Sequence, residues 1–381
     1  MRHERVPLTV RRSVVVISDW VEDGDAAWPE LQPPPNYANG PAASEPVDVV
    51  GSYLERLPLA LVAAGIVEQA EIWHHWRGAG PSPFRRETAV LGRRGFRLDG
   101  DAAPFASTAM EAFIRRYGAP HILIVYGLGV APSVLELCAN SIILYNSIDA
   151  PALRVPPECS ALFDLVLTGA QWQSDAVVAR HPGMATAILP VGPDFAAIDQ
   201  FRPLGTAKDV DLIYVAAAQP YKRHDILFDA LARLPRDVRA LCVFGYGEMA
   251  DDLRRDAAER NLSVEFVGPP GVGIDAVNQL MNRARFGVVC GVDDGAPAIL
   301  TEYMLAGLPV LANAALSCGL QYILPETGIT ATAEGFGDAI MTLRDTAATY
   351  DPRAAVLDHW TWPHSVRRLG EIIAAIHDSK Q

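Results

Sequence analysis

The sequence predicts an α/β protein with two doubly wound, mostly parallel domains. Its 381 residues are half apolar, which is enough for two domains of about 150–200 residues, each with its own core. Short apolar runs alternate with helical patterns from end to end, as is typical of parallel sheets covered by helices on both faces. An irregular, proline-bearing stretch at 192–208 suits a linker between the two domains.

The predicted strands fall on both sides of this linker. In chain order they are 13–18, 71–74, 121–126, 141–145, 163–168, 187–191, 212–216, 240–244, 263–267, 286–290 and 309–312. We therefore expect a first domain at 1–203 and a second at 204–360. A last segment, 361–381, is predicted to be mainly helix.

Composition excludes several classes of function. A net charge of -13 and a pI of about 5.1 argue against general nucleic-acid binding, which relies on clustered Lys and Arg. The five cysteines are odd in number and lack zinc-ligand spacing, so we expect reduced core residues and no bound metal. With no N-terminal signal segment and no apolar run of about 18 residues, a soluble cytoplasmic protein is expected.

The most informative segment follows the apolar run 286–290. Asp294 is a suitable N-cap for a helix with Pro297 in its first turn, and free N–H groups at a helix start suit a phosphate. Glu302 lies eight residues after Asp294, which places the two on similar helix faces about 12 Å apart. This spacing suits a nucleotide sugar. The alternative is an ordinary strand-to-helix joint with a capping aspartate.

This segment, which continues into Gly307-Leu-Pro309-Val310, resembles the family 4 retaining glycosyltransferases (glycosyltransferase group 1), where a Glu occupies the place of Asp294. The resemblance implies the GT-B fold, two Rossmann-like domains facing a cleft, with the C-terminal helix crossing back to the first domain. It also implies roles for the segment itself. Asp294 would orient the donor sugar and Glu302 would hold the ribose, while four residues would line the sugar and phosphate: Gly295, Ala296, Pro297 and Ala298.

A second motif follows the predicted strand 212–216. There, an amphipathic helix is predicted to open with Lys222 and Arg223, although positive charge is unfavourable at a helix start and so indicates a function. By the resemblance, Lys222 would clamp the diphosphate. Ala217 occupies the position of the family's second cation, and Arg223 is the candidate to compensate. The alternative for both cations is a solvated helix end.

Glycine turns and one polar segment complete the predicted site. By the resemblance, the turn at Gly245 and Gly247 and the strand end at Gly268 face the nucleotide, and Gly51 starts the first long helix beside the donor phosphate. The family often has a catalytic-site histidine after a middle strand of the first domain, where this sequence has Asn146 and Asp149. Either residue fits that position, and the alternative for Asp149 is a turn cap.

The resulting hypothesis is a hexosyltransferase-like enzyme that transfers a sugar from a nucleotide-diphosphate sugar to an acceptor hydroxyl with retention. Lys222, Asp294 and Asp149 are the predicted catalytic residues, and no cofactor or metal is expected because no Asp-x-Asp motif is evident. The alternatives are a related transferase that couples a cyclitol-like nucleotide donor to an amine, and a non-catalytic sugar-nucleotide-binding module.

The acceptor side is less defined, and a small molecule, a glycan and a lipid-linked acceptor are all open. An arginine cluster at 77–97 is either a membrane-surface patch or a solvated loop and hairpin. The proline-rich stretch 29–46 is either a lid or a variable surface loop.

Overall fold

The computed structural model describes residues 12–22, 46–78 and 83–380. These residues form two compact units, one within Met1–Val191 and Trp362–Gln381, the other comprising Gly192–Thr361. The predicted boundary at residue 203 lies inside the second unit, because Ala196 and Phe201 pack in the core of that unit. The N-terminal segment and nearly all of the stretch 29–46 lie outside the described residues.

The described part of the first unit contains an eight-stranded sheet in the order β3-β4-β2-β1-β5-β6-β7-β8. Every neighbouring pair is parallel except β3 and β4. The strands are β1 (Ser13–Glu22), β2 (Gln69–Trp76), β3 (Phe84–Arg86), β4 (Leu91–Arg97), β5 (Ile122–Tyr126), β6 (Ile142–Asn146), β7 (Leu165–Thr168) and β8 (Ala185–Ile188).

Strand β1 lies at the point where this strand order reverses. Val16 pairs with Ile72 of β2 on one side and with Ile124 of β5 on the other. All three side chains are fully buried, as expected for a parallel sheet covered on both faces. Open parallel sheets bind ligands outside the carboxyl ends of the strands at such a reversal point, so the ends of β1 and β5 mark a candidate site.

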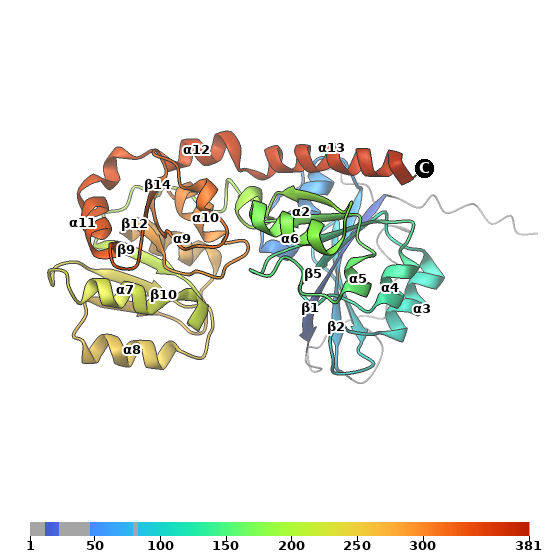
Figure 1. The fold of residues 1–381 in the computed structure, drawn as a ribbon, viewed down its shortest axis with the longest axis horizontal. Helices are drawn as coiled ribbons and strands as arrows, with labels where there is room; N and C mark the ends of the chain where they lie inside the picture. Colours follow the sequence, from blue (N-terminus) through green and yellow to red (C-terminus); the bar gives the residue numbers. More distant parts are fainter. Residues whose placement is uncertain (1–11, 23–45, 79–82, 381) are drawn as a thin grey trace, which may run out of the picture. The chain divides into compact units, whose positions relative to one another are not determined.

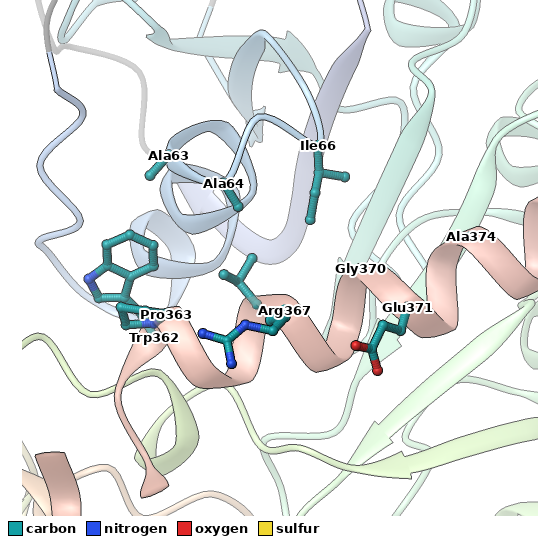
Figure 2. A pocket seen from close by; sticks show the side chains of 10 residues that line it. Ala63, Ala64, Ile66, Trp362, Pro363, Arg367, Gly370, Glu371 and Ala374 are labelled. Carbon is teal, nitrogen blue, oxygen red and sulfur yellow. The ribbon is translucent and has the colours of Figure 1, made fainter. Parts of the chain in front are cut away.

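Helices cover both faces of this sheet. A hydrophobic core includes residues of α3 (Thr108–Tyr117), α4 (Pro132–Leu137), α5 (Pro157–Ser160) and α6 (Gln171–Arg180). Helix α2 (Tyr53–Ala63) packs on β1 and β2, and the long final helix α13 (Trp362–Lys380) packs on α2 and β6 (Figure 1). The end of α2 and the first half of α13 border a cavity of about 620 Å³, with Trp362 at one end (Figure 2).

The second unit contains a six-stranded sheet with the order β11-β10-β9-β12-β13-β14, all parallel. Its strands are β9 (Val210–Val215), β10 (Ala240–Val243), β11 (Val264–Val267), β12 (Ala284–Val289), β13 (Val310–Asn313) and β14 (Gly328–Ala331). Four short 3-10 turns accompany them in this unit: η1 (Pro193–Phe195), η2 (Pro220–Lys222), η3 (Leu320–Tyr322) and η4 (Ala347–Thr349).

Alternating side chains of these strands enter two cores on opposite faces of the sheet. Leu212 and Tyr214 of β9 belong to one core, and Ile213 between them belongs to the other. The first core is covered by α7 (His224–Leu231), α8 (Ala250–Glu259) and α11 (Phe336–Thr346) (Figure 1). The second is covered by α9 (Ile274–Arg283), α10 (Ile299–Leu305) and α12 (Pro352–His359).

The arginine cluster at 77–97 contains two antiparallel strands, β3 and β4, which agree with the hairpin of the second interpretation, although β4 also joins the main sheet beside β2. Arg94 is fully buried, and its Nη2 donates to Glu71 Oε1 at 3.0 Å. Arg93 binds Glu55 at 2.6 Å and Glu87 at 2.7 Å. Because both guanidinium groups are paired with carboxylates, these two arginines add no unpaired positive charge to the surface.

All five cysteines are buried free thiols, as predicted. Among the described residues, no helix has the length and apolar character needed to span a membrane.

Candidate functional site

The predicted donor-site residues of the second unit gather at one edge of its sheet. All six strands are parallel, so the segments that follow them emerge at their common carboxyl edge. Lys222 follows β9, Gly245 and Gly247 follow β10, Gly268 follows β11, and Asp294 follows β12. The topology therefore places at one edge residues that are up to 72 positions apart in the chain.

Lys222 and Asp294 meet in an ion pair in which Lys222 Nζ donates to Asp294 Oδ2. The two side chains are largely buried, with exposures of 17% and 11%. The ammonium also lies 4.8 Å from the ring centroid of Tyr221, within cation–π range. The hydroxyl of Tyr214 donates to the Lys222 carbonyl at 2.6 Å and so fixes the main chain of Lys222. The predicted sugar-binding acid and diphosphate-binding cation are thus in direct contact.

The segment that carries Asp294 is fastened to its neighbours on both sides. Val292 N donates to the Tyr221 carbonyl at 3.4 Å, and the Val292 carbonyl accepts from Ser317 N at 2.8 Å and from Ser317 Oγ at 2.7 Å. A Cβ added at Gly291 would lie 3.2 Å from the Tyr221 oxygen, so the approach of the two segments requires little side-chain bulk there. This arrangement restricts where the Asp294 carboxylate can reach.

The prediction that Asp294 caps a helix is wrong. Helix α10 begins at Ile299, its N-cap position is Ala298, and no side chain caps it. The reason lies in Pro297, because a residue before proline is disfavoured in helical conformation and Ala296 is that residue. Asp294 therefore precedes the helix, and the calculated spacing of about 12 Å to Glu302 along one helix face does not apply. Glu302 lies in the first turn of α10 and is half-buried.

The residues Gly295 to Ala298 form an irregular connection held between two glycines that the sequence analysis did not single out. A Cβ at Gly192 would lie 2.7 Å from the Ala296 carbonyl oxygen, and a Cβ at Gly319 would lie 3.0 Å from Pro297 Cγ. Thr301 Oγ1 also donates to the Pro193 carbonyl at 3.1 Å, which joins α10 to η1. Packing of this kind, rather than a cap, sets the course of the chain before α10.

The second motif also differs from its predicted form. Lys222 ends the 3-10 turn η2, Arg223 has a left-handed backbone with φ of 52°, and α7 begins only at His224. The prediction that α7 opens with two cations is therefore wrong. Arg223 donates three hydrogen bonds to Asp225: Nε to Oδ1 at 2.9 Å, Nε to Oδ2 at 3.2 Å and Nη2 to Oδ2 at 2.7 Å. Hydrogen bonding by Asp225 raises the pKa of Arg223, and hydrogen bonding by Arg223 lowers the pKa of Asp225. The Arg223 side chain is therefore paired with the first turn of α7.

The glycine turns at this edge pack backbone against backbone. Gly247 has φ of 123°, and an added Cβ would collide with the main chain of Ala218. Gly268 has φ of 77°, and an added Cβ would collide with the carbonyl of Phe244. Ala218 N donates to the Tyr246 carbonyl at 2.8 Å. These close approaches give the glycines a structural role, while the side chain of Tyr246 between Gly245 and Gly247 is exposed.

In the first unit, Gly51 leads into the start of α2, as predicted. Its φ of 101° lets the chain turn into Ser52, whose side chain caps the helix in a capping box with Glu55. The Gly51 carbonyl accepts from Arg56 Nε at 2.8 Å. A Cβ at Gly51 would lie 2.8 Å from Glu55 Cβ, so a side chain there would disturb the cap.

Asp149 lies beyond the carboxyl end of β6, where it faces an arginine that the sequence analysis did not mention. Arg154 Nη1 donates to Asp149 Oδ2 at 3.3 Å and lies 3.8 Å from Asp19 Oδ2. Gln173 Nε2 donates to the Asp149 carbonyl at 2.8 Å. Asp19 lies within β1, where the pairing with β2 shifts register, and it accepts from Leu128 N at 3.1 Å. The signal that could have identified Asp19 is its place after the first predicted strand, at the reversal point of the sheet.

Asn146, the other residue considered for this position, is the last residue of β6. Its side chain is fully buried, and neither amide atom has a hydrogen-bond partner among the described residues. Neighbouring positions of β5 and β7 are Tyr126 and Leu167. A buried amide without partners is costly and calls for an explanation such as a bound water or ligand.

The cavity between α2 and α13 contains none of the predicted site residues. Its lining is mainly apolar, with Arg367 and Glu371 of α13 as its charged members (Figure 2). The predicted residues of the first unit lie instead at the carboxyl ends of the strands and at the start of α2.

Comparison with known proteins tests the resemblance. Residues 198–333 match the family model described as glycosyl transferases group 1. No curated protein matches the chain. The sucrose-phosphate synthase of Thermosynechococcus elongatus is a similar solved structure, with a TM-score of 0.69 and 16% identity, covering 97% of this chain and 100% of that one.

Two other solved structures are similar over nearly the whole chain. HepE of Anabaena, solved with UDP and glucose, has a TM-score of 0.63 and 14% identity and covers 96% of this chain and 100% of its own. A glycosyltransferase of Rickettsia africae has a TM-score of 0.64 and 12% identity and covers 96% and 98%. The GT-B fold predicted from the sequence is confirmed. The chain therefore has the GT-B fold, and its residues 198–333 match the glycosyl transferases group 1 family.

Proposed function

We propose that this chain is a glycosyltransferase, a retaining enzyme of the family 4 type that moves a sugar from a nucleoside-diphosphate sugar to an acceptor hydroxyl without a metal ion. The observation that supports it best is the contact of Lys222 with Asp294 at the carboxyl edge of the second sheet. It joins a cation suited to a diphosphate with a carboxylate suited to sugar hydroxyls. The complex of HepE with UDP and glucose supports a uridine nucleotide as the first donor to try.

In this proposal, Lys222 stabilises the diphosphate as it leaves. A fixed positive charge beside a group that becomes more negative lowers the barrier, because the charge is in place before the reaction begins. The Tyr214 hydrogen bond and the partial burial of Lys222 hold the ammonium in position. Asp294 accepts hydrogen bonds from hydroxyls of the donor sugar, and Glu302 binds the ribose. The charge of Lys222 replaces the one that a divalent ion supplies elsewhere.

For the first unit, we propose Asn146 rather than Asp149 as the residue that binds substrate. An amide can donate and accept in one contact with a sugar or acceptor hydroxyl. Asp149 already has Arg154 and Gln173 as partners, whereas the described residues offer the Asn146 amide none. The main-chain placement at the end of β6 fits a group that meets ligand at the edge of the sheet.

The reaction type is tested by incubating the protein with UDP-glucose, UDP-galactose, UDP-GlcNAc and their GDP, ADP and TDP counterparts, with simple glycosides as acceptors. NMR of the product should show the anomeric configuration of the donor, and EDTA should leave the rate unchanged. An inverted product would refute retention. A rate abolished by EDTA and restored by Mg²⁺ would refute metal independence. Nucleotide binding without transfer or hydrolysis would favour the non-catalytic module.

Asn146→Ala is expected to separate activity from stability. Loss of a substrate contact should lower kcat/KM about 10–100-fold, in the range of one or two hydrogen bonds. The free energy of unfolding should fall little or rise, because removal of an unpartnered buried amide removes a desolvation cost of about 1–3 kcal/mol. Steady-state kinetics and urea unfolding measure the two effects.

Asp149→Ala is the matched comparison on the same segment. We expect a smaller loss of activity from it than from Asn146→Ala, because its carboxylate is 35% exposed and already paired. A stable Asn146→Ala variant with wild-type kcat/KM, or a larger loss from Asp149→Ala, would assign the role to Asp149 instead.

A further inference from the structure

The ion pair between Lys222 and Asp294 has a consequence for which ligands the site accepts. In the structure, the cation predicted to bind the diphosphate is paired with the acid predicted to bind the sugar. The next cation in the sequence, Arg223, is in turn held by Asp225. A phosphate group that approaches Lys222 therefore competes with the Asp294 carboxylate for the same ammonium.

The fold fixes the main chain on both sides of this ion pair, which distinguishes it from a contact between two mobile surface side chains. The main chain of Lys222 is held by Tyr214, and the segment before Asp294 is held by Tyr221 and Ser317. The side-chain exposures of 17% and 11% place the pair in a partly dehydrated environment, where opposite charges attract more strongly than at an open surface. A carboxylate left behind by Lys222 there would need new hydrogen-bond donors.

From this geometry we infer that Asp294 makes the site select an intact nucleotide sugar over the free nucleoside diphosphate. The inference rests on the proposed function. A nucleoside diphosphate takes Lys222 away from Asp294, and the carboxylate then lies close to added negative charge without the one side-chain donor that the described residues give it. A nucleotide sugar takes Lys222 with its diphosphate and also offers sugar hydroxyls to the carboxylate. The sugar and the diphosphate thus assist each other's binding through one ion pair.

This selection has a use in turnover. After transfer, the product is a nucleoside diphosphate without its sugar, and Asp294 then competes with it for Lys222. Return of the ion pair favours product release and lowers product inhibition. Asp294 would therefore determine specificity in addition to orienting the sugar.

The test measures by calorimetry how tightly wild type and Asp294→Asn bind a nucleotide sugar and the corresponding nucleoside diphosphate. UDP-glucose and UDP are the starting pair. If the wild type binds another nucleotide sugar of the donor panel more tightly, that nucleotide sugar and its diphosphate are used instead. Asp294→Asn should bind the diphosphate about 10-fold more tightly, because Lys222 is no longer neutralised. Its affinity for the nucleotide sugar should gain less or fall, so the preference for the intact donor shrinks. Asp294→Ala serves as a second variant if Asp294→Asn does not fold.

Two controls separate the ion pair from a general change of charge. In a Lys222→Met background, Asp294→Asn should bring no specific gain beyond that of Asp237→Asn. Asp237 precedes β10, away from the carboxyl edge, and binds Arg344 at 2.7 Å, so Asp237→Asn removes the same charge elsewhere on the unit and should leave the preference unchanged.

The outcomes distinguish this inference from the proposed function. If no nucleotide or nucleotide sugar binds the wild type, the proposed function falls and the inference falls with it. If they bind, but Asp294→Asn tightens neither or tightens both equally, only the inference is overturned. A tighter diphosphate with a reduced preference for the intact donor supports it.

Discussion

Lys222→Ala is expected to lower kcat/KM for the donor about 100- to 1000-fold, the usual effect of removing one preorganised group that stabilises developing charge. The expectation is large because Ala217 stands where the resembled family has a second cation, and its side chain is small, apolar and buried. Lys222 is then the main fixed positive charge proposed for the leaving diphosphate. Steady-state kinetics with varied donor concentration measures the loss.

The adjacent Arg223→Ala is the matched control, since it removes the same charge one residue away. Arg223 is 43% exposed and donates three hydrogen bonds to Asp225, so we expect kcat/KM to change by no more than about 3-fold. Equal losses in both variants would mean that the edge acts through its overall charge. A larger loss from Arg223→Ala would assign the diphosphate contact to that residue.

The division of the Lys222 effect between kcat and KM carries further information. A charge that acts on the departing diphosphate in the transition state lowers kcat, whereas one that only binds the ground state raises KM. We expect most of the loss in kcat. Lys222→Arg keeps the charge but carries it on a longer side chain with a planar head group, so the charge lies in a different place and only part of the activity should be recovered.

The sequence predicted the two parallel sheets because their central strands are continuous apolar runs between helical patterns, as in 286–290 and 309–312. It offered a solvated hairpin at 77–97 as one interpretation, but it did not predict that β4 joins the main sheet, because a segment with several arginines and glycines does not resemble a buried strand. Arg94 becomes buried only because Glu71, on the neighbouring strand β2, supplies its counter-charge. A pairing between different strands is not visible in either segment alone.

The meeting of Lys222 and Asp294 was predictable from topology, since residues that follow parallel strands share one edge. The ion pair between their side chains was not predictable, because it depends on the conformations of the two segments that follow β9 and β12. The prediction that helix α10 starts at Asp294 was wrong for a local reason that the sequence does contain, namely the effect of Pro297 on the backbone of Ala296. The contact between Gly192 and the Ala296 carbonyl had no sequence signal, because it joins segments far apart in the chain.

The buried pair of Glu71 and Arg94 gives the largest expected effect on stability. Arg94 donates to Glu71 through Nε at 3.1 Å and Nη2 at 3.0 Å, and Trp73 Nε1 donates to the same carboxylate at 2.7 Å. The guanidinium lies 4.5 Å from the ring centroids of both Phe84 and Phe113. With side-chain exposures of 0% and 1%, neither charge can be solvated by water in place of its partner.

Arg94→Met should therefore lower the free energy of unfolding of the first unit by about 3–5 kcal/mol, because it leaves the Glu71 carboxylate buried with its cationic partner removed. Glu71→Gln/Arg94→Met should recover most of this loss, because both charges are gone while the Gln oxygen still accepts from Trp73. Urea unfolding, with hydrogen exchange of the β2 and β4 amides to identify the first unit, measures both variants.

Arg283→Met on the second unit is the matched control. Arg283 binds two carboxylates, Asp209 and Glu265, but their side chains are 48% and 41% exposed, so the free energy of unfolding should fall by only about 0–1 kcal/mol. If Arg94→Met were as stable as the double variant, the carboxylate would have found another partner, and the pair would not be what holds β2 to β4.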